Sequence, residues 1–140
     1  MNFGQVISNL NFLAVLVAAF SAFFIGWIWY GPLFGKKWME LNGFTKENMS
    51  QKKWLPLPLI MGINYIATLL AAFSLAMFLG TESDAVFGIF AGLMIAIFWI
   101  ATSRLNDVLY EQKPMGLFWI NVGYNVAIYV IMGAIIGAWK

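Results

Sequence analysis

Residues 26–38 read Gly-Trp-Ile-Trp-Tyr-Gly-Pro-Leu-Phe-Gly-Lys-Lys-Trp, and this stretch has the pattern of a membrane border. No charged side chain precedes Lys36 and Lys37 in the chain. Tryptophan and tyrosine gather at the lipid–water interface, because one part of each ring system is apolar and another part forms hydrogen bonds. Pro32 has no N–H group and biases Gly31 away from helical geometry, so we predict that the first helix ends at this pair.

The composition is typical of a membrane protein. Of the 140 residues, 62% are hydrophobic and only 10% are charged, whereas about a quarter of a soluble domain is charged. The net charge of +2 gives no basic stripe for nucleic acid. The absence of cysteine and histidine argues against Cys/His metal sites, a cysteine nucleophile and histidine acid–base catalysis. We therefore expect no cofactor, no metal and no nucleic-acid partner.

Four long uncharged runs predict four membrane-spanning helices. A helix rises 1.5 Å per residue, so roughly 20 apolar residues cross a hydrocarbon core about 30 Å thick. The runs lack the alternation of β-strands. We predict an all-α fold, with residues 1–140 forming a single integral membrane domain that is a four-helix transmembrane bundle. Its helices are expected over about residues 10–31, 55–80, 85–104 and 115–138. No basic residue precedes the first run, so we expect a retained helix and not a cleaved signal peptide.

The charges between the runs predict an orientation. Seven of the eight basic residues lie in the first and third connections, and the second connection carries only Glu82 and Asp84. Basic residues collect on the cytoplasmic side of membrane proteins. We therefore predict a multi-pass protein whose two termini both lie outside.

The first connection, over residues 32–53, has the pattern of short amphipathic helices at the cytoplasmic interface. Its first part places apolar side chains on one helical face and stops at Asn42-Gly43. Its second part has Thr45 as a candidate N-cap, with Phe44 and Met49 as a hydrophobic staple. A partly ordered basic loop is the alternative.

Small residues recur at four-residue spacing in every predicted span, which allows helices to approach closely in lipid. The fourth span contains Gly133-x-x-x-Gly137. These glycines pack either within one bundle or between two copies of the chain, so self-association is a prediction with an intramolecular alternative.

Polar side chains within the spans are the candidates for a binding site. Asn64 lies in the second span, and Asn121, Tyr124 and Asn125 lie in the fourth. Both spans start from the same side, which places Asn64 and Asn125 at a similar depth of about 15 Å. An unpaired amide in hydrocarbon costs several kcal/mol. These amides therefore either form interhelical hydrogen bonds or line a polar site for a neutral solute or ion.

A charged cluster of Arg104, Asp107 and Glu111 continues the third span at helical spacing. It is a candidate for binding a lipid headgroup or capping a pore, and a solvated helix end is the alternative. No charged residue lies within a predicted apolar core, which argues against proton-coupled transport. Glu40, Asp107 and Glu111 are the carboxylates available to an enzyme acting on lipid, and no nucleophile or metal set accompanies them. We expect no catalytic residue and no enzymatic activity.

The run Trp29-Tyr30-Gly31-Pro32-Leu33-Phe34-Gly35-Lys36-Lys37-Trp38, followed by Asn42-Gly43-Phe44, resembles the signature of a bacterial family of small integral membrane proteins. That family is known only as a conserved domain of unknown function. The resemblance extends more loosely to residues 109–114 and 120–124. It implies a four-helix protein of the bacterial inner (plasma) membrane, but no substrate and no reaction. It adds weight to Trp29, Tyr30, Gly31, Pro32, Phe34, Gly35, Trp38, Asn121 and Tyr124.

Three functions are compatible with the sequence. The one favoured is a non-enzymatic structural or interaction module, which we expect to self-associate and to have the lipid bilayer as its other partner. It predicts a dry bundle and a GxxxG or aromatic interface. The second is a small channel or facilitator for a neutral solute or ion, which predicts a water-filled path that touches Asn64, Asn121 or Asn125. The third, a membrane enzyme acting on lipid, has the least support.

Overall fold

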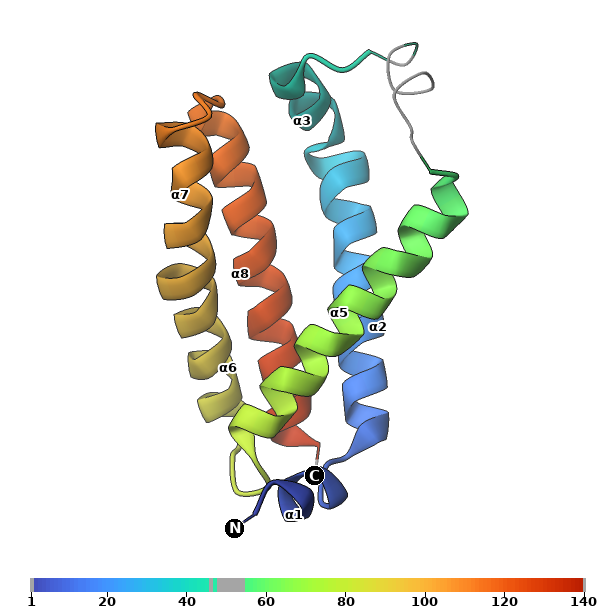
Figure 1. Cartoon of the computed structure of the whole chain (residues 1–140), viewed down its shortest axis with the longest axis vertical. Helices are drawn as coiled ribbons and strands as arrows, with labels where there is room; N and C mark the ends of the chain where they lie inside the picture. The colour runs from blue at the N-terminus through green and yellow to red at the C-terminus, as the bar shows by residue number, and fades with distance from the viewer. Residues whose placement is uncertain (1, 46, 48–54, 140) are drawn as a thin grey trace.

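A computed structural model describes residues 2–45, 47 and 55–139 of the chain (Figure 1). Four helices in this part are long and apolar enough to cross a membrane, and they cover Phe12–Leu33, Leu57–Leu79, Ala85–Leu109 and Met115–Ala138. The prediction of an all-α, four-helix fold is therefore confirmed. The two termini lie at one end of the bundle, and α3 and the turn between α7 and α8 lie at the other end.

Several of these spans are divided into shorter helical elements. The first comprises α2 and η1, and the third comprises α6, η2 and α7, where η1 and η2 are π-helical. The elements in chain order are α1 (Phe3–Ser8), α2 (Phe12–Ile28), η1 (Trp29–Leu33), α3 (Gly35–Asn42), α5 (Leu57–Leu79), α6 (Ala85–Met94), η2 (Ile95–Ala101), α7 (Thr102–Leu109) and α8 (Met115–Ala138).

The first span continues through Gly31-Pro32, so the helix end predicted at this pair is wrong. In η1 the N–H of Phe34 donates to the carbonyl of Trp29 at 2.9 Å, which is a bond across five residues. A π turn can include Pro32, which has no N–H group to donate. The hydrogen bonds of this turn span five residues and not four, so the α-helical pattern that Pro32 would interrupt has already ended. The helical backbone breaks at Phe34, where φ is −122° and ψ is 5°.

The helix α3 lies within the stretch where an amphipathic helix was predicted. It ends at Gly43, whose φ of 70° is the left-handed geometry that glycine adopts at helix ends. Residues 46 and 48–54 lie outside the described part of the chain. The predicted second helix of this connection, with Met49 in its staple, falls mainly on them.

A short N-terminal helix, α1, was missed in the sequence, although its capping signals are present. The side chain of Asn2 accepts a hydrogen bond from the N–H of Gln5 at 2.9 Å, and Oε1 of Gln5 accepts one from the N–H of Asn2 at 3.3 Å. Asn11 then caps α2 by accepting from the N–H of Ala14 at 3.1 Å. The first span therefore begins at Phe12, two residues later than predicted.

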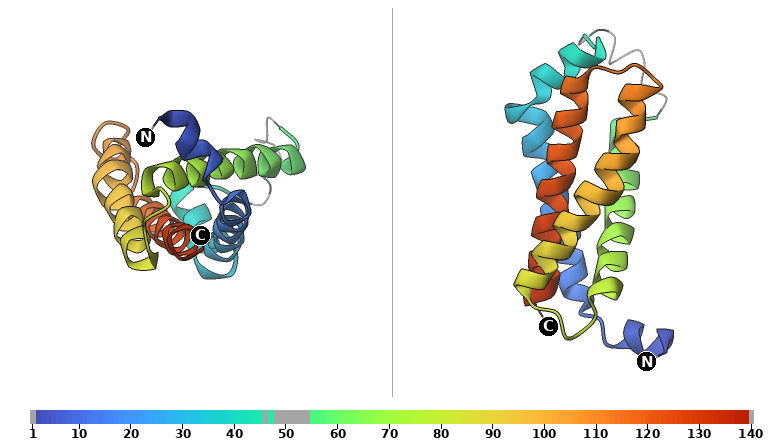
Figure 2. Two further views of the ribbon diagram at one scale, coloured as in Figure 1. Left: turned by 90° about the horizontal axis from the view of Figure 1, so that it is seen from below. Right: turned by 90° about the vertical axis from the view of Figure 1, so that its left-hand side faces the viewer.

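The core occupies the half of the bundle near the two termini. Small side chains of α2 and α5 allow these helices to approach each other there, and Met132 of α8 is fully buried beside them. The buried residues of α5 all lie in its second half: Thr68, Ala72, Leu75, Ala76 and Leu79. Figure 2 (left) shows why, because α5 lies across the bundle and its N-terminal end points away from it.

The closest helix contact joins α6 to α8 through glycines. A Cβ atom placed on Gly133 would clash with the carbonyl oxygen of Gly88, and one on Gly137 would clash with that of Asp84. Gly133 and Gly137 therefore pack α8 against α6 within one chain, which is the intramolecular alternative, and that face is covered. Self-association of the chain stays a prediction, and this contact does not support it.

Candidate binding cleft

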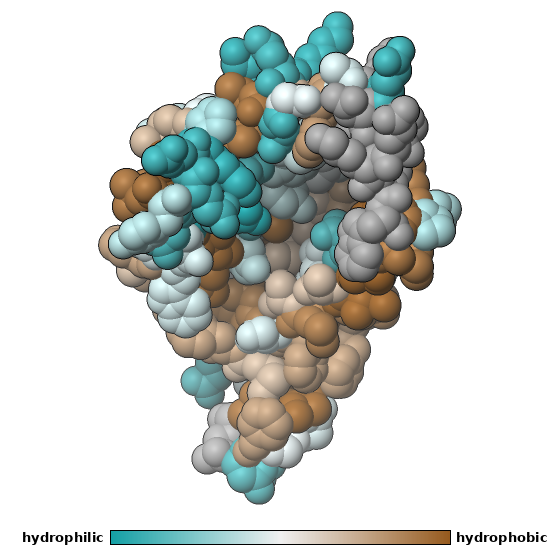
Figure 3. Space-filling view, turned by 45° about the horizontal axis from the view of Figure 1, so that its top comes forward, coloured by the Kyte–Doolittle hydropathy of each residue, from teal (hydrophilic) through white to brown (hydrophobic). Residues whose placement is uncertain are grey.

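A cleft of about 660 Å³ opens at the end of the bundle that bears the α7–α8 turn. Side chains of η1, α3, α5, α7, α8 and the α7–α8 turn line it. Figure 3 shows a hollow at this end of the molecule, with hydrophilic side chains along part of its edge. Sites for small molecules have volumes of roughly 300–1,000 Å³, so the cleft is large enough for one.

The sequence of α5 explains why a cleft forms here. Leu57, Ile60 and Asn64 lie at helical spacing on the same stripe as Thr68 and Ala72. The small residues of this stripe pack into the core, whereas the three larger residues before them line the cleft. One face of α5 therefore closes the bundle in its second half and forms the cleft wall in its first half.

Charged side chains of α7 and of the α7–α8 turn form the rim of the cleft. Arg104 Nη1 lies 3.7 Å from Asp107 Oδ2, and both residues line the cleft. Lys113 also lines it and pairs with Glu111, with 3.2 Å between Nζ and Oε2. Of the predicted cluster, Glu111 is thus the member that does not line the cleft. Lys113 was not among the predicted site residues, although it lies in the looser resemblance over residues 109–114, because a single lysine in a turn does not by itself indicate a site.

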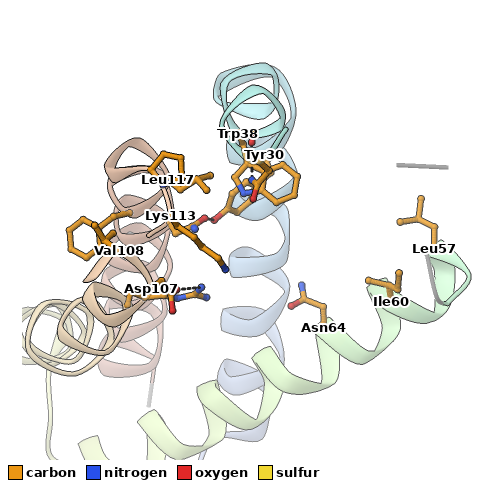
Figure 4. Close-up of a pocket in the computed structure, with 14 residues that line it drawn as sticks. Tyr30, Trp38, Leu57, Ile60, Asn64, Asp107, Val108, Lys113 and Leu117 are labelled. Atoms are coloured by element: carbon orange, nitrogen blue, oxygen red, sulfur yellow. Dashed lines mark hydrogen bonds and ion pairs between the residues drawn. The ribbon is translucent and has the colours of Figure 1, made fainter. Parts of the chain in front are cut away.

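The α7–α8 turn holds Lys113 in place. The N–H of Lys113 donates to the carbonyl of Asp107 at 3.2 Å, and Gln112 before it takes a left-handed φ of 55°. Pro114 follows as the N-cap residue of α8, which begins at Met115. In Figure 4, Lys113 and Asp107 lie on one side of the cleft and Asn64 lies across from them.

The aromatic residues of the motif over residues 29–38 have two roles, because some line the cleft and others pack against neighbouring helices. Tyr30 and Trp38 line the cleft, and their ring centroids are 5.8 Å apart in an edge-on arrangement. Trp29 turns away, because its Nε1–H donates to the carbonyl of Ile120 at 2.9 Å. Phe34 packs against Trp29, with 4.8 Å between the centroids.

The three other motif residues shape the backbone. Gly35 is buried, and a Cβ atom there would clash with the carbonyl oxygen of Tyr30, so the start of α3 requires glycine. Gly31 and Pro32 are exposed members of the π turn. These positions are structural, and they support the two aromatic residues that face the cleft.

The candidate amides have three different environments. Asn121 lines the cleft and accepts an interhelical hydrogen bond at its Oδ1 from the Tyr30 hydroxyl at 2.7 Å. Asn125 donates to the carbonyl of Asn121 in its own helix at 2.8 Å, and it does not line the cleft. Asn64 lines the cleft, and its side-chain amide makes no hydrogen bond with the described residues. The sequence treated these amides as one group, and the structure separates them into three environments.

Tyr124 belongs to the support of the cleft wall and not to its lining. Its ring packs edge-on against Tyr30 with 5.1 Å between the centroids, and its hydroxyl covers Gly26 of α2. Tyr30 is thereby held by an aromatic contact on one side and by Asn121 on the other.

We expect Tyr30→Phe to lower the free energy of unfolding by about 1 kcal/mol, because hydrogen bonds between membrane helices contribute roughly 0.6 and up to about 1.7 kcal/mol. The measurement is a double-mutant cycle with Asn121→Ala in mixed micelles. Tyr129→Phe is the control, since its hydroxyl makes no hydrogen bond with the described residues. A coupling energy near zero would contradict the Tyr30–Asn121 bond.

The cleft does not continue through the bundle. Below Asn64, the next residue of the stripe is Thr68, which is buried and donates to the Asn64 carbonyl at 2.8 Å. Ala72 and Met132 are fully buried further along α5 and α8. A separate hollow of about 100 Å³ lies near the termini, between Leu10, Ile136 and their neighbours. The described residues thus form a cleft that is closed toward the termini. They contain no cluster of acidic side chains that could hold a metal ion.

Comparison with known proteins places this chain in a family. No curated protein and no solved structure matches the chain. A family model does match, from the start of the first span to the end of the fourth, and the matched region includes every residue that lines the cleft. Because the model described as "Protein of unknown function (DUF1761)" matches residues 13–137, which is most of the chain, the protein belongs to this family.

Proposed function

We propose that this protein is a small membrane facilitator, which binds a solute in the cleft and carries it across the membrane when the closed half of the bundle opens. The observation that supports this proposal is the cleft itself, in which charged side chains lie across from Asn64, whose amide makes no hydrogen bond with the described residues. An unpaired amide is costly against lipid, but it is well placed where it meets water or a ligand.

Two structural facts weigh against the structural or interaction module that the sequence favoured. That function predicts a dry bundle, whereas the described residues enclose a cleft of about 660 Å³. Of its two predicted interfaces, the GxxxG interface would need a free face, whereas Gly133 and Gly137 are covered by α6, and the aromatic interface stays open. The absence of enzymatic activity and the self-association of the chain remain predictions.

The second function predicted from the sequence was a channel or a facilitator, and a channel fits the structure less well. A channel needs a continuous path, and buried residues of α5 and α8 close the described bundle below Asn64. A carrier needs only a site that is open on one side at a time. No carboxylate lines the cleft below Asp107 at its rim, so we propose facilitated movement without proton coupling.

We propose that the cleft opens to the cytoplasm of a bacterial inner membrane. Lys36, Lys37, Arg104 and Lys113 belong to the segments at the cleft end of the bundle, and basic residues favour the cytoplasmic side. The α5–α6 turn at the opposite end carries only acidic charges. Both termini lie at that end, and they would therefore face outside.

The test of a water-filled cleft uses the fact that the chain has no cysteine. We expect Asn64→Cys to react with a membrane-impermeant maleimide added to proteoliposomes, because the attacking thiolate forms only where the thiol meets water. Ile63→Cys is the matched control on the same helix, since Ile63 is 51% exposed but does not line the cleft. Ala72→Cys, at a position with 0% exposure, is the core control.

We expect labelling of Asn64→Cys to be about tenfold or more faster than that of either control, from the cytoplasmic side only. Equal and slow labelling of all three variants would show a dry bundle. The facilitator would then be excluded, and the interaction module would be the better proposal.

A further inference from the structure

We infer that the ligand of the cleft is an amphipathic anion, in which a carboxylate or phosphate headgroup is attached to an alkyl chain. This inference rests on the proposed function and names the ligand class of the same site. It follows from the way in which charged, apolar and amide side chains are distributed over the walls of the cleft.

The charges that line the cleft favour an anion. Among the side chains that line the cleft, two are cations, Arg104 and Lys113, and one is a carboxylate, Asp107. Glu111 pairs with Lys113 from outside the lining, with side chains 59% and 52% exposed. The ion pairs of these cations are weak, because Arg104 and Asp107 lie 3.7 Å apart with side chains 49% and 35% exposed, and exposed pairs contribute only about 0–1 kcal/mol. An anionic headgroup enclosed by the cleft would form stronger, charge-assisted hydrogen bonds with the same cations.

The opposite wall is apolar. Leu57 and Ile60 of α5 lie across the cleft from Lys113 and Asp107 (Figure 4). Leu57 is 49% exposed, and the first half of α5 contains no buried side chain, so this wall continues into the lipid-facing surface of the helix. A chain attached to the headgroup can therefore lie along α5 and reach the lipid without crossing the charged rim.

The two walls together exclude the simpler ligand classes. A small inorganic anion would leave the apolar wall of Leu57 and Ile60 without a partner. A neutral apolar molecule would form no ion pair with Arg104 or Lys113 and would partly remove water from both charges, which is unfavourable. An amphipathic cation inside the cleft would meet two cations and one carboxylate in the lining, because Glu111 lies outside it.

The test uses Asn64→Cys protein in nanodiscs of phosphatidylcholine, with protection of the cysteine from maleimide as the measure of occupancy. The probes are dodecyl phosphate, inorganic phosphate and dodecyltrimethylammonium at equal concentrations. We expect dodecyl phosphate to protect the cysteine, and we expect the other two to protect it at least about tenfold less well.

Charge variants in the same background give effects of opposite sign. Arg104→Gln and Lys113→Gln should each weaken protection by dodecyl phosphate about fivefold, whereas Asp107→Asn should strengthen it about fivefold. Lys37→Gln is the matched control, since Lys37 is an exposed cation at the same end that does not line the cleft. A purely structural role of these residues would not produce tighter binding in Asp107→Asn.

The possible failures are distinguishable. Better protection by the cation, equal protection by inorganic phosphate, or weaker protection in Asp107→Asn would each overturn the amphipathic anion. A cysteine that is labelled but protected by none of the probes would overturn it as well, while leaving the water-filled cleft intact. A cysteine that is not labelled at all would exclude the proposed facilitator itself.

Discussion

Gly133→Leu is expected to abolish the folded bundle. At this position the backbones of α6 and α8 touch, and even a single Cβ atom would clash with the carbonyl oxygen of Gly88. A leucine must separate the two helices, which also removes the neighbouring contacts of Gly92 and Gly137 with the opposite backbone. Overpacking of this kind costs about 3 kcal/mol or more, and in lipid no hydrophobic drive holds the separated helices together.

The measurement is the fraction of monodisperse protein after size-exclusion chromatography in detergent, together with Tm. Gly62→Leu is the matched control, because nothing lies within 4 Å of a Cβ atom at Gly62. Removing a glycine from the interior of α5 should leave Tm unchanged or raise it. If Gly133→Leu protein had the Tm of the unmodified chain, α6 and α8 would not pack through these glycines.

The four spans were predictable because the hydrocarbon core of a membrane offers backbone groups no hydrogen-bond partners. Each uncharged run must satisfy its backbone internally, and a helix is the form that does so within one segment. Turns and charges at the ends of the runs then set the helix bounds to within a few residues. The continuation past Pro32 was not predictable, because the residue types do not distinguish an α turn that ends from a π turn that continues.

The cleft was predictable only in part. Asn64 and Asn121 stand out as amides within apolar helices, but the sequence does not show which of them finds a partner. That choice depends on how far α5 lies from its neighbours, and this distance is a tertiary property. The stripe from Leu57 through Asn64 to Ala72 carries a local signal, since large residues change to small ones halfway along it. Lys113 carries no such signal, because its position depends on the α7–α8 turn.

Asn64→Leu is expected to reduce the transbilayer movement of a fluorescent alkyl phosphate about tenfold or more, with Tm almost unchanged. The amide of Asn64 makes no hydrogen bond with the described residues, so its removal breaks none there. Leucine would remove the polar group at the closed end of the cleft and would fill that space with an apolar side chain. Movement is measured in phosphatidylcholine vesicles, where dithionite quenches the fluorescent alkyl phosphate that lies in the outer leaflet.

Asn125→Leu is the control that separates a site from simple packing. Asn125 is also an asparagine within a spanning helix, but it donates to its own helix and does not line the cleft. We therefore expect it to keep full transport of the alkyl phosphate. Equal loss of transport in both variants would indicate a general defect and would argue against a role of Asn64 in the site. If the unmodified protein bound the alkyl phosphate but did not move it, the cleft would be a binding site of a protein that is not a carrier, because occupancy alone does not require the closed half to open.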